Sequence, residues 1–197
     1  MHGRGEGAPV ADKRYYMACL DLEGRSCLVV GGGRVALEKG RELAACGARV
    51  AVVAPRIEPE LAALAAEALP RRYRSCDLDG RFLVAAATAR PQVDRQVFAD
   101  AEARQVLCNV ADAPELCSLI LPAVHRQGPI AVAVSTGGAS PALAQRLRDE
   151  AATIVRPEHA ALARRLRELR PWAKEHLPTY EARRDYFRRL VEEALAR

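Results

Sequence analysis

The chain has 197 residues, half of them hydrophobic, and a formal net charge of +5. This length suffices for a substantial core and one or two domains, so we expect a folded globular protein. No stretch approaches the roughly 18 uninterrupted apolar residues of a membrane span. Residues 1–14 lack the apolar core of a secretory signal, so we expect a flexible lead-in and a cytoplasmic protein.

The positive charge comes mostly from arginines that are dispersed among acidic residues. Such a charge could attract nucleic acid or a polyanionic small molecule, but the absence of one basic block with aromatic residues argues against nucleic acid. The six cysteines form no Cys-x-x-Cys pair and the histidines no His-x-x-x-His pair. We therefore expect buried free thiols and no preformed metal site.

The stretch Leu28–Ala36 reads LVVGGGRVA, an apolar run that leads through three glycines into a helical pattern. Gly31, Gly33 and Ala36 have the G-x-G-x-x-G/A spacing of a dinucleotide-binding turn. In such a turn the first glycine permits the tight bend, the second lets the backbone approach the phosphates, and the small third residue lets helix pack on strand. The amides of the helix N-terminus would face the pyrophosphate. The alternative is a glycine-rich turn without a ligand.

Strands and helices are expected to alternate along the first two thirds of the chain. The predicted strands are 27–30, 49–53, 82–87, 106–110, 119–122 and 130–135, and the predicted helices are 35–46, 58–69 and 91–104. Alternation in units of about 25–30 residues indicates a parallel, doubly wound sheet. We therefore expect an α/β, Rossmann-like domain over residues 15–140.

The character of the sequence changes near residue 140. Ser140 and Pro141 form an N-cap and N1 pair that begins a helix through about Ala152. The rest of the chain is predicted to be helical and rich in Arg and Glu, with interruptions at Pro171 and Pro178. Because residues 141–197 have little core of their own, we expect them to pack on a second copy as a homodimer. Packing on the chain's own sheet is the alternative.

The second predicted strand ends without the acid that usually binds the ribose hydroxyls. Its last residues lead into Pro55 and Arg56. Arg56 could stack on adenine or meet a 2′-phosphate, so this chemistry leaves NAD and NADP open. Thr88 follows the next buried strand and could line the same crevice, or it could be an ordinary strand-end cap.

Polar residues also mark the strand that ends near residue 110, whose carboxyl end should open on the same crevice. Asn109 and Asp112 lie at that edge and could orient a cofactor or move a proton. The alternative for Asp112, which precedes an Ala-Pro pair, is a turn former.

A second glycine loop precedes the helix that begins after Ser140. Ser135, Thr136, Gly137 and Gly138 could cradle an anion, or the glycines could serve only the turn. His125 adds a titratable group a few residues earlier, although it could equally be an ordinary surface residue.

Some motifs are missing. No tyrosine has a lysine four residues later, as a short-chain dehydrogenase would need, and no G-x-S-x-G elbow is present. The glycines are not followed by the lysine of a phosphate-binding P-loop. These classes of enzyme are therefore disfavoured.

Taken in order, these clusters resemble the precorrin-2 dehydrogenase family, the NAD-dependent part of siroheme synthases. The matching segments are LDLEGR (20–25), VGGGRVALEK (30–39), Ala86–Thr88, NVADAP (109–114) and VSTGGASP (134–141). The resemblance covers roughly residues 16–148, and the helical tail matches in character only.

The resemblance implies oxidation of precorrin-2 to sirohydrochlorin with hydride passing to NAD⁺, and in some members Fe²⁺ insertion to give siroheme. Asp112 matches the family's essential aspartate, which is proposed to assist proton removal. The resemblance also favours NAD over NADP. It further implies that the methyltransferase domain of fused siroheme synthases is absent. The cofactor-binding positions that it matches are Gly31, Gly33, Arg34, Val35, Pro55 and Arg56.

The implied substrate is a large polycarboxylate macrocycle, which needs a wide and basic cleft. The positive charge and the hydroxyl–glycine loop of 135–138, with His125 nearby, suit that demand. Two alternatives stay open. One is a non-enzymatic, NAD-sensing Rossmann domain, and the other is a chelatase without dehydrogenase activity.

Overall fold

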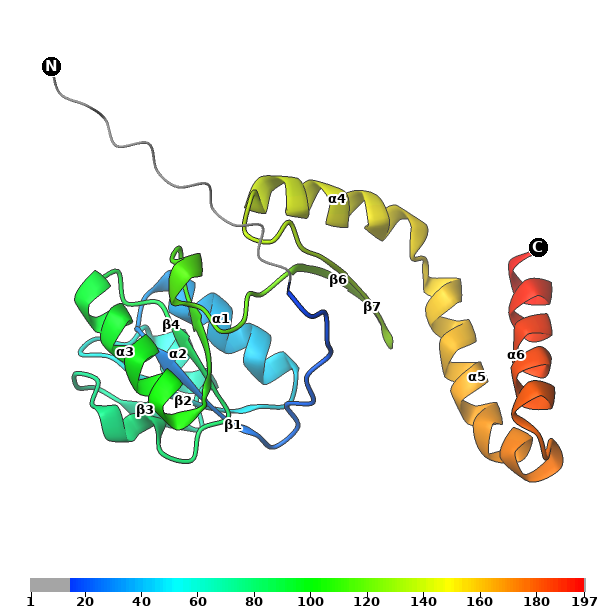
Figure 1. Cartoon of the computed structure of the whole chain (residues 1–197), viewed down its shortest axis with the longest axis horizontal. Helices are drawn as coiled ribbons and strands as arrows, with labels where there is room; N and C mark the ends of the chain where they lie inside the picture. The colour runs from blue at the N-terminus through cyan, green and yellow to red at the C-terminus, as the bar shows by residue number, and fades with distance from the viewer. Residues whose placement is uncertain (1–14, 197) are drawn as a thin grey trace, which may run out of the picture. The chain divides into compact units, whose positions relative to one another are not determined.

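The computed structural model describes residues 15–196, so the lead-in expected over 1–14 lies outside the described residues. The chain divides into two compact units, the first ending at Leu121 and the second beginning at Pro122 (Figure 1). This boundary differs from the predicted division after residue 140. Among the described residues, no helix combines the length and apolarity that crossing a membrane requires.

The first unit is a parallel five-stranded sheet with the strand order β3-β2-β1-β4-β5. Its strands are β1 (Ser26–Val30), β2 (Arg49–Val53), β3 (Glu67–Leu69), β4 (Leu83–Ala86) and β5 (Leu107–Val110). Its helices are α1 (Arg34–Ala45), α2 (Pro59–Leu64) and α3 (Pro91–Arg104), with short 3₁₀ turns η1 (Ser75–Leu78) and η2 (Pro114–Leu116). This order is that of a doubly wound Rossmann sheet, as predicted.

The sheet is buried on both faces because its strands are runs of aliphatic residues. One face packs against α1 and α2, through residues such as Leu37 and Leu61. The other packs against α3, through Val97 and Ala101. Each fully buried Val or Leu stabilises the fold by about 1.5–3 kcal/mol. The helices that follow β1 and β4 thus lie on opposite faces, which creates a switch point between these two strands.

Two sequence-based element assignments in this unit are wrong. The helix expected over 58–69 ends at Leu64, and its last residues form β3, which pairs with β2. The amide of Ala66 donates to the carbonyl of Val50 at 2.8 Å, so edge pairing outweighs the helix propensity of an alanine-rich segment. The strand expected over 119–122 does not form either, and a strand begins only at Ala123, after Pro122.

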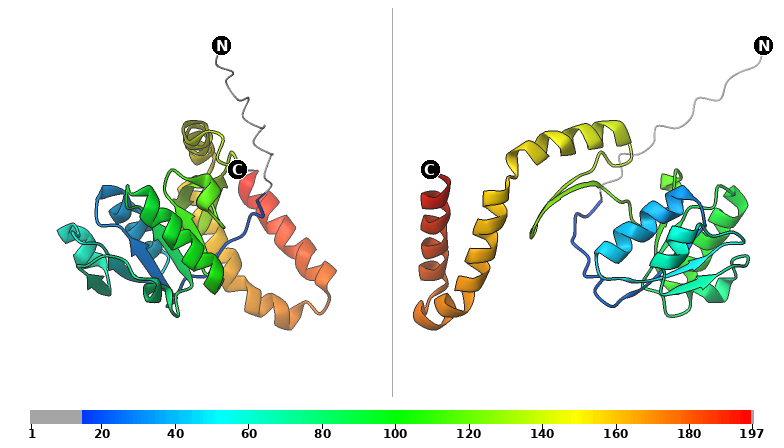
Figure 2. Two further views of the ribbon diagram at one scale, coloured as in Figure 1. Left: turned by 60° about the vertical axis from the view of Figure 1, so that its left-hand side comes forward. Right: turned by 180° about the vertical axis from the view of Figure 1, so that it is seen from behind.

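The second unit consists of an antiparallel hairpin and three helices. Its elements are β6 (Ala123–Gln127), β7 (Ile130–Val134), α4 (Pro141–Ile154), α5 (Pro157–His176) and α6 (Tyr180–Leu195). Helix α4 packs on both strands, and α5 and α6 lie side by side (Figure 2). The hairpin is a two-stranded sheet of its own, separate from the parallel sheet.

The predicted interruption at Pro171 is wrong, because α5 continues through this proline to His176. The second predicted interruption, at Pro178, is present: α5 has ended before it, and Thr179 after it is the N-cap of α6. The hydroxyl of Thr179 accepts a hydrogen bond from the amide of Ala182 at 3.1 Å, as an N-cap does.

Candidate active site

The glycine turn joins β1 to α1 at the switch point of the sheet. Gly31 has a φ of +135°, and a Cβ at this position would lie 2.2 Å from the carbonyl oxygen of Ala87. Its amide donates to the carbonyl of Val53 at 3.0 Å. Gly31 is therefore required by the packing of the neighbouring strand ends, and only glycine fits there.

Gly33 is a glycine of a different kind. It is the N-cap of α1, and a Cβ there would meet nothing within 4 Å. The first turn of α1 contains no acidic residue. Since first-turn amides lack intrahelical partners and carry the positive end of the helix dipole, this N-terminus is open to an anion. The geometry fits a dinucleotide pyrophosphate.

The two residues after Gly33 lie at the rim of this N-terminus. Val35 is 41% exposed, and Arg34 is also exposed, with its Nε atom 3.9 Å from Glu38. Ala36 is fully buried, and its Cβ is 3.4 Å from where a side chain on Gly31 would begin. The small third residue of the motif thus packs the helix on the strand, as predicted, while cofactor contacts by Arg34 and Val35 stay predictions.

The loop after β2 is fastened to the glycine turn through Gly32. A Cβ on Gly32 would lie 1.8 Å from the carbonyl oxygen of Arg56, and the amide of Glu58 donates to the Gly32 carbonyl at 2.9 Å. Pro55 and Arg56 are exposed beside this contact. Sequence reasoning missed Gly32, although this middle glycine of three in a row was a visible signal for a close backbone approach.

Thr88 lies in the short connection between β4 and α3. Its hydroxyl donates to Asp94 Oδ1 at 2.7 Å and accepts from the amide of Arg90 at 3.0 Å. Asp94 is buried in the first turn of α3. The structure therefore gives Thr88 the role of a strand-end cap, and a cofactor contact by this residue stays a prediction.

Asn109 is 8% exposed on β5, and its Nδ2 atom donates to the carbonyl of Leu119 at 3.2 Å. This bond holds the returning chain against the strand. Asp112 lies two residues beyond β5, after Ala111, whose amide makes the last bond to β4 at Ala86 O, 2.9 Å. Asp112 is exposed and has a φ of +58°. It therefore stands at the carboxyl edge of the sheet, after β5, which is one strand away from the switch point.

The second glycine loop lies in the second unit. The hydroxyl of Thr136 accepts from the amide of Ser140 at 3.0 Å, and that of Ser135 accepts from the amide of Gly137 at 3.2 Å. Gly137 and Gly138 have positive φ values of 65° and 91°. These bonds and glycines shape the turn into α4, so an additional role in binding an anion stays a prediction.

His125 lies on β6, opposite Val132 of β7. Its Nε2 atom is buried and has no hydrogen-bond partner among the described residues. The side chain is half-buried, which differs from an ordinary surface histidine. Among residues 15–196, no group of three His, Cys, Asp or Glu side chains is placed to hold a metal ion.

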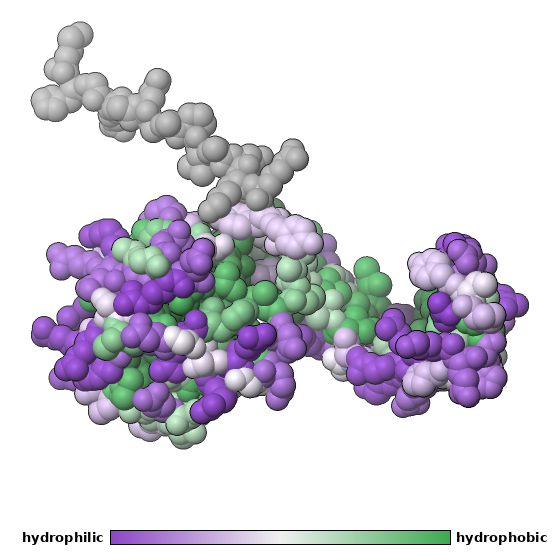
Figure 3. Space-filling view, turned by 60° about the horizontal axis from the view of Figure 1, so that its bottom comes forward, coloured by the Kyte–Doolittle hydropathy of each residue, from purple (hydrophilic) through white to green (hydrophobic). Residues whose placement is uncertain are grey.

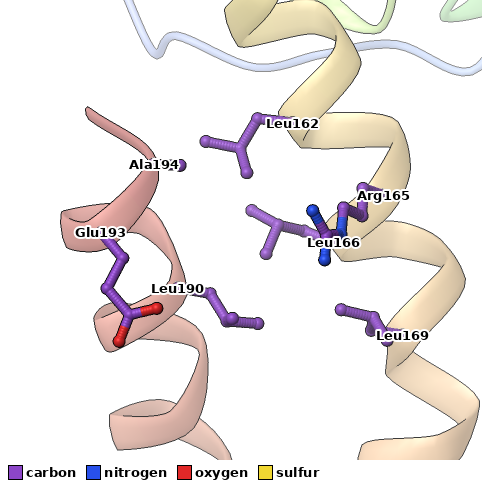
Figure 4. A pocket seen from close by; sticks show the side chains of 7 residues that line it. All are labelled: Leu162, Arg165, Leu166, Leu169, Leu190, Glu193 and Ala194. Atoms are coloured by element: carbon purple, nitrogen blue, oxygen red, sulfur yellow. The ribbon is translucent and has the colours of Figure 1, made fainter. Parts of the chain in front are cut away.

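A pocket of about 300 Å³ lies between α5 and α6 (Figure 4). Its leucines come from both helices and point toward one another, with Arg165 and Glu193 at its rim. None of the predicted site residues lines it. The leucines are Leu162, Leu166, Leu169 and Leu190.

Comparison with known proteins gives the chain a family. A family model described as "Putative NAD(P)-binding" matches residues 18–123, and one described as "Sirohaem biosynthesis protein central" matches residues 127–150. Siroheme synthases of Thioalkalivibrio sulfidiphilus and Chromobacterium violaceum are each 42% identical to it, over 90% and 92% of this chain. The chain spans only 37% and 40% of the length of these relatives.

A solved structure named "SirC, precorrin-2 dehydrogenase" resembles the whole fold. The TM-score is 0.69 at 23% sequence identity, covering 93% of this chain and 100% of that chain. At this level of identity the likeness confirms the predicted Rossmann-like fold with its helical C-terminal region.

Proposed function

The chain belongs to the NAD(P)-binding family of sirohaem biosynthesis proteins, and from this premise we propose that it oxidises precorrin-2 to sirohydrochlorin with NAD⁺. One observation carries the proposal. The open N-terminus of α1 at Gly33 and the carboxylate-bearing loop at Asp112 lie along the same carboxyl edge of the sheet. A nucleotide site and a proton acceptor at one edge are what a dehydrogenase needs.

NAD⁺, when bound, supplies the acceptor for the hydride. The chain's own part is to hold the cofactor and to take up a proton. The amides after Gly33 are suited to bind the pyrophosphate, and the loop with Pro55 and Arg56 lies beside them through Gly32. Asp112 would accept a proton that the macrocycle releases as it is oxidised. The Asn109 side chain fixes the chain that follows the Asp112 loop by its bond to Leu119. The Thr88 hydroxyl fixes the first turn of α3 by its bond to Asp94.

The substrate is an acidic macrocycle, and we assign its binding to the second unit. Ser135, Thr136, Gly137 and Gly138 form a turn with hydroxyls and amides, and His125 carries an unpartnered ring nitrogen. The net charge of +5 favours the approach of a polycarboxylate. We further propose that the protein works in the cytoplasm. If the protein also inserts Fe²⁺ into sirohydrochlorin, the metal is a substrate and no resident cofactor.

We propose that the second unit makes the protein a homodimer. Its helices expose large apolar side chains, among them Leu143, Ile154 and Leu195, of which Ile154 is 70% exposed. The outer surface of α5 and α6 on the face shown in Figure 3 is mainly hydrophilic. We propose that a second copy covers these exposed apolar side chains of α4 and α6.

The test is anaerobic incubation of the protein with precorrin-2 and NAD⁺, followed by absorbance spectroscopy. The proposal expects sirohydrochlorin and NADH to form together. Product formation without NAD⁺, or none with it, would contradict the proposal. Later addition of Fe²⁺ or Co²⁺ separates a dehydrogenase alone from one that also inserts metal, because only the latter gives a metal-bound spectrum. Binding of NAD⁺ without any turnover would indicate the NAD-sensing alternative.

A further inference from the structure

We infer that Cys117 is a positioning residue for Asp112, whose thiol holds the loop between β5 and η2 in the conformation that sets the carboxylate at the sheet edge. The inference rests on the proposed function, because Asp112 matters to catalysis only if it accepts a proton there. The arrangement of the loop itself is independent of that function.

The thiol of Cys117 bridges the two sides of Asp112. Sγ accepts a hydrogen bond from the amide of Val110 at 3.2 Å, on the strand side. Its S–H lies within donating distance of the carbonyl of Ala113 on the other side, at 3.3 Å, and of the Val110 carbonyl, at 3.4 Å. Cys117 is 4% exposed, so water cannot replace these bonds. One sulfur atom thus links Val110 to Ala113 across the two residues between them, Ala111 and Asp112.

The segment that carries Cys117 is itself fixed to β5. The amide of Cys108 donates to Ser118 Oγ at 2.8 Å, and the amide of Ser118 donates to the Cys108 carbonyl at 2.9 Å. Asn109 adds the bond from its Nδ2 atom to Leu119 O. Because the returning chain is anchored at these points, the sulfur of Cys117 has a defined position and can impose it on the loop.

The backbone of Asp112 requires such a constraint. Its φ of +58° lies in the left-handed region, which aspartate tolerates better than most residues but does not prefer. Conformations of this kind persist when the surrounding structure determines them. Without the sulfur, the backbone around Asp112 is free to relax toward negative φ, and the carboxylate moves. A displacement of about 1 Å at a reacting group can lower a rate by about a hundredfold.

The test compares Cys117→Ala and Cys117→Ser with Cys27→Ala as a matched control. Cys27 is a buried thiol as well, but it lies in the sheet, near the amino end of β1. We expect Cys117→Ala to lower kcat for precorrin-2 oxidation by about ten- to a hundredfold with an unchanged Kd for NAD⁺. Cys117→Ser keeps a donor and an acceptor and should lose less. Cys27→Ala should keep kcat once corrected for the folded fraction.

A double-mutant cycle separates positioning from general stability. In an Asp112→Asn background, where the proton acceptor is absent, Cys117→Ala should cause no further fall in kcat. A further fall as large as in the wild type would overturn the inference. If Cys117→Ala fails to fold, the same comparison is made with Cys117→Ser, whose residual loss should disappear in the same background.

Amide hydrogen exchange of residues 110–116 gives a readout that does not depend on turnover. Exchange should be faster in Cys117→Ala than in the wild type and in Cys27→Ala. Unchanged exchange together with unchanged kcat would refute the role of Cys117. A wild type that binds NAD⁺ but does not oxidise precorrin-2 would refute the proposed function, and the exchange rates would still decide whether the sulfur holds the loop.

Discussion

Neighbouring glycines of one turn serve different purposes, because different atoms surround them. The position of a Cβ on Gly31 is already occupied by the carbonyl of Ala87, whereas the corresponding position on Gly33 is open. Space that the protein leaves empty beside a helix N-terminus is the place for a phosphate. Gly31 is thus a requirement of the fold, whereas we propose that Gly33 is required by the cofactor.

We therefore predict that alanine substitutions at the two glycines affect different properties, stability at Gly31 and NAD⁺ binding at Gly33. Gly31→Ala should lower the free energy of unfolding by about 1–3 kcal/mol, since a backbone carbonyl must move. Gly33→Ala should leave thermal stability nearly unchanged and weaken NAD⁺ binding by at least about tenfold, because its methyl group meets the pyrophosphate. Thermal unfolding and calorimetric titration with NAD⁺ measure the two effects. Equal NAD⁺ affinity of Gly33→Ala and the wild type would place the cofactor elsewhere.

How far these residues could be predicted depends on how local their signals are. Gly31, Gly33 and Asp112 are readable because each is marked by a turn directly after a strand. The role of Cys117 is not readable, because it depends on the chain returning to bond with β5 several residues earlier. A single cysteine between apolar residues predicts only burial.

At the scale of elements, local propensity fails where distant strands pair. Residues 67–69 have a helical pattern, but β2 offers them an edge with free hydrogen-bonding groups. The next segment is shaped by ionic contacts: Asp77, whose side chain is 4% exposed, receives two bonds from Arg71, at 2.9 and 2.6 Å, and one from the amide of Arg74 at 2.8 Å. The hydrophobic periodicity of the sequence reveals neither the pairing of β3 with β2 nor the hydrogen bonds of Asp77. The existence of β1, β2, β4 and β5 is predictable, since their aliphatic runs are unambiguous.

Asp77 makes the stability of this segment depend on pH. Burial by itself raises the pKa of Asp77, but the guanidinium of Arg71 and the amide of Arg74 outweigh it and leave the pKa below its usual value. Because the pKa is lower in the folded state, the stabilisation is present above the unfolded pKa of about 3.9 and is lost as pH falls through the folded value.

We predict that Asp77→Asn lowers the free energy of unfolding at pH 7 by about 1–3 kcal/mol. The difference from the wild type should narrow as the pH falls below about 4, because Asp77 is then protonated first in the unfolded state and, at lower pH, in the folded state as well. Urea denaturation of both proteins at pH 7 and below pH of about 4 measures the difference in unfolding free energy and its decrease at low pH. Asp79→Asn is the control, because Asp79 pairs with Arg104 while 66% exposed and should cost about 1 kcal/mol or less. A loss that is the same at both pH values would contradict this account.

At the scale of the whole molecule, the two units differ in how well each supplies its own core. The first has a sheet covered on both faces. The buried residues of the second are few and small, such as Ala144, Ala160 and Ala173, and several of its large apolar side chains, such as Leu143 and Ile154, are exposed. A partner copy is therefore expected to complete the second unit.

We predict a mass of twice the 21.4 kDa of one chain by light scattering at micromolar concentration. Ile154→Asp should shift the protein toward the monomer, because a carboxylate cannot be buried without a partner in an apolar contact. Gln145→Asp, at an exposed polar position of the same helix, should not. A monomeric wild type would contradict the proposed homodimer.

The most direct test of the central claim is to measure NAD⁺ binding and precorrin-2 oxidation side by side in the wild type and in Asp112→Ala. The account predicts that both bind NAD⁺ with equal affinity, since the carboxylate is not part of the glycine turn, and that only the wild type forms sirohydrochlorin with one NADH for each product. Near-wild-type turnover by Asp112→Ala would remove Asp112 from the mechanism. A wild type that forms no sirohydrochlorin with NAD⁺ would contradict the proposed function.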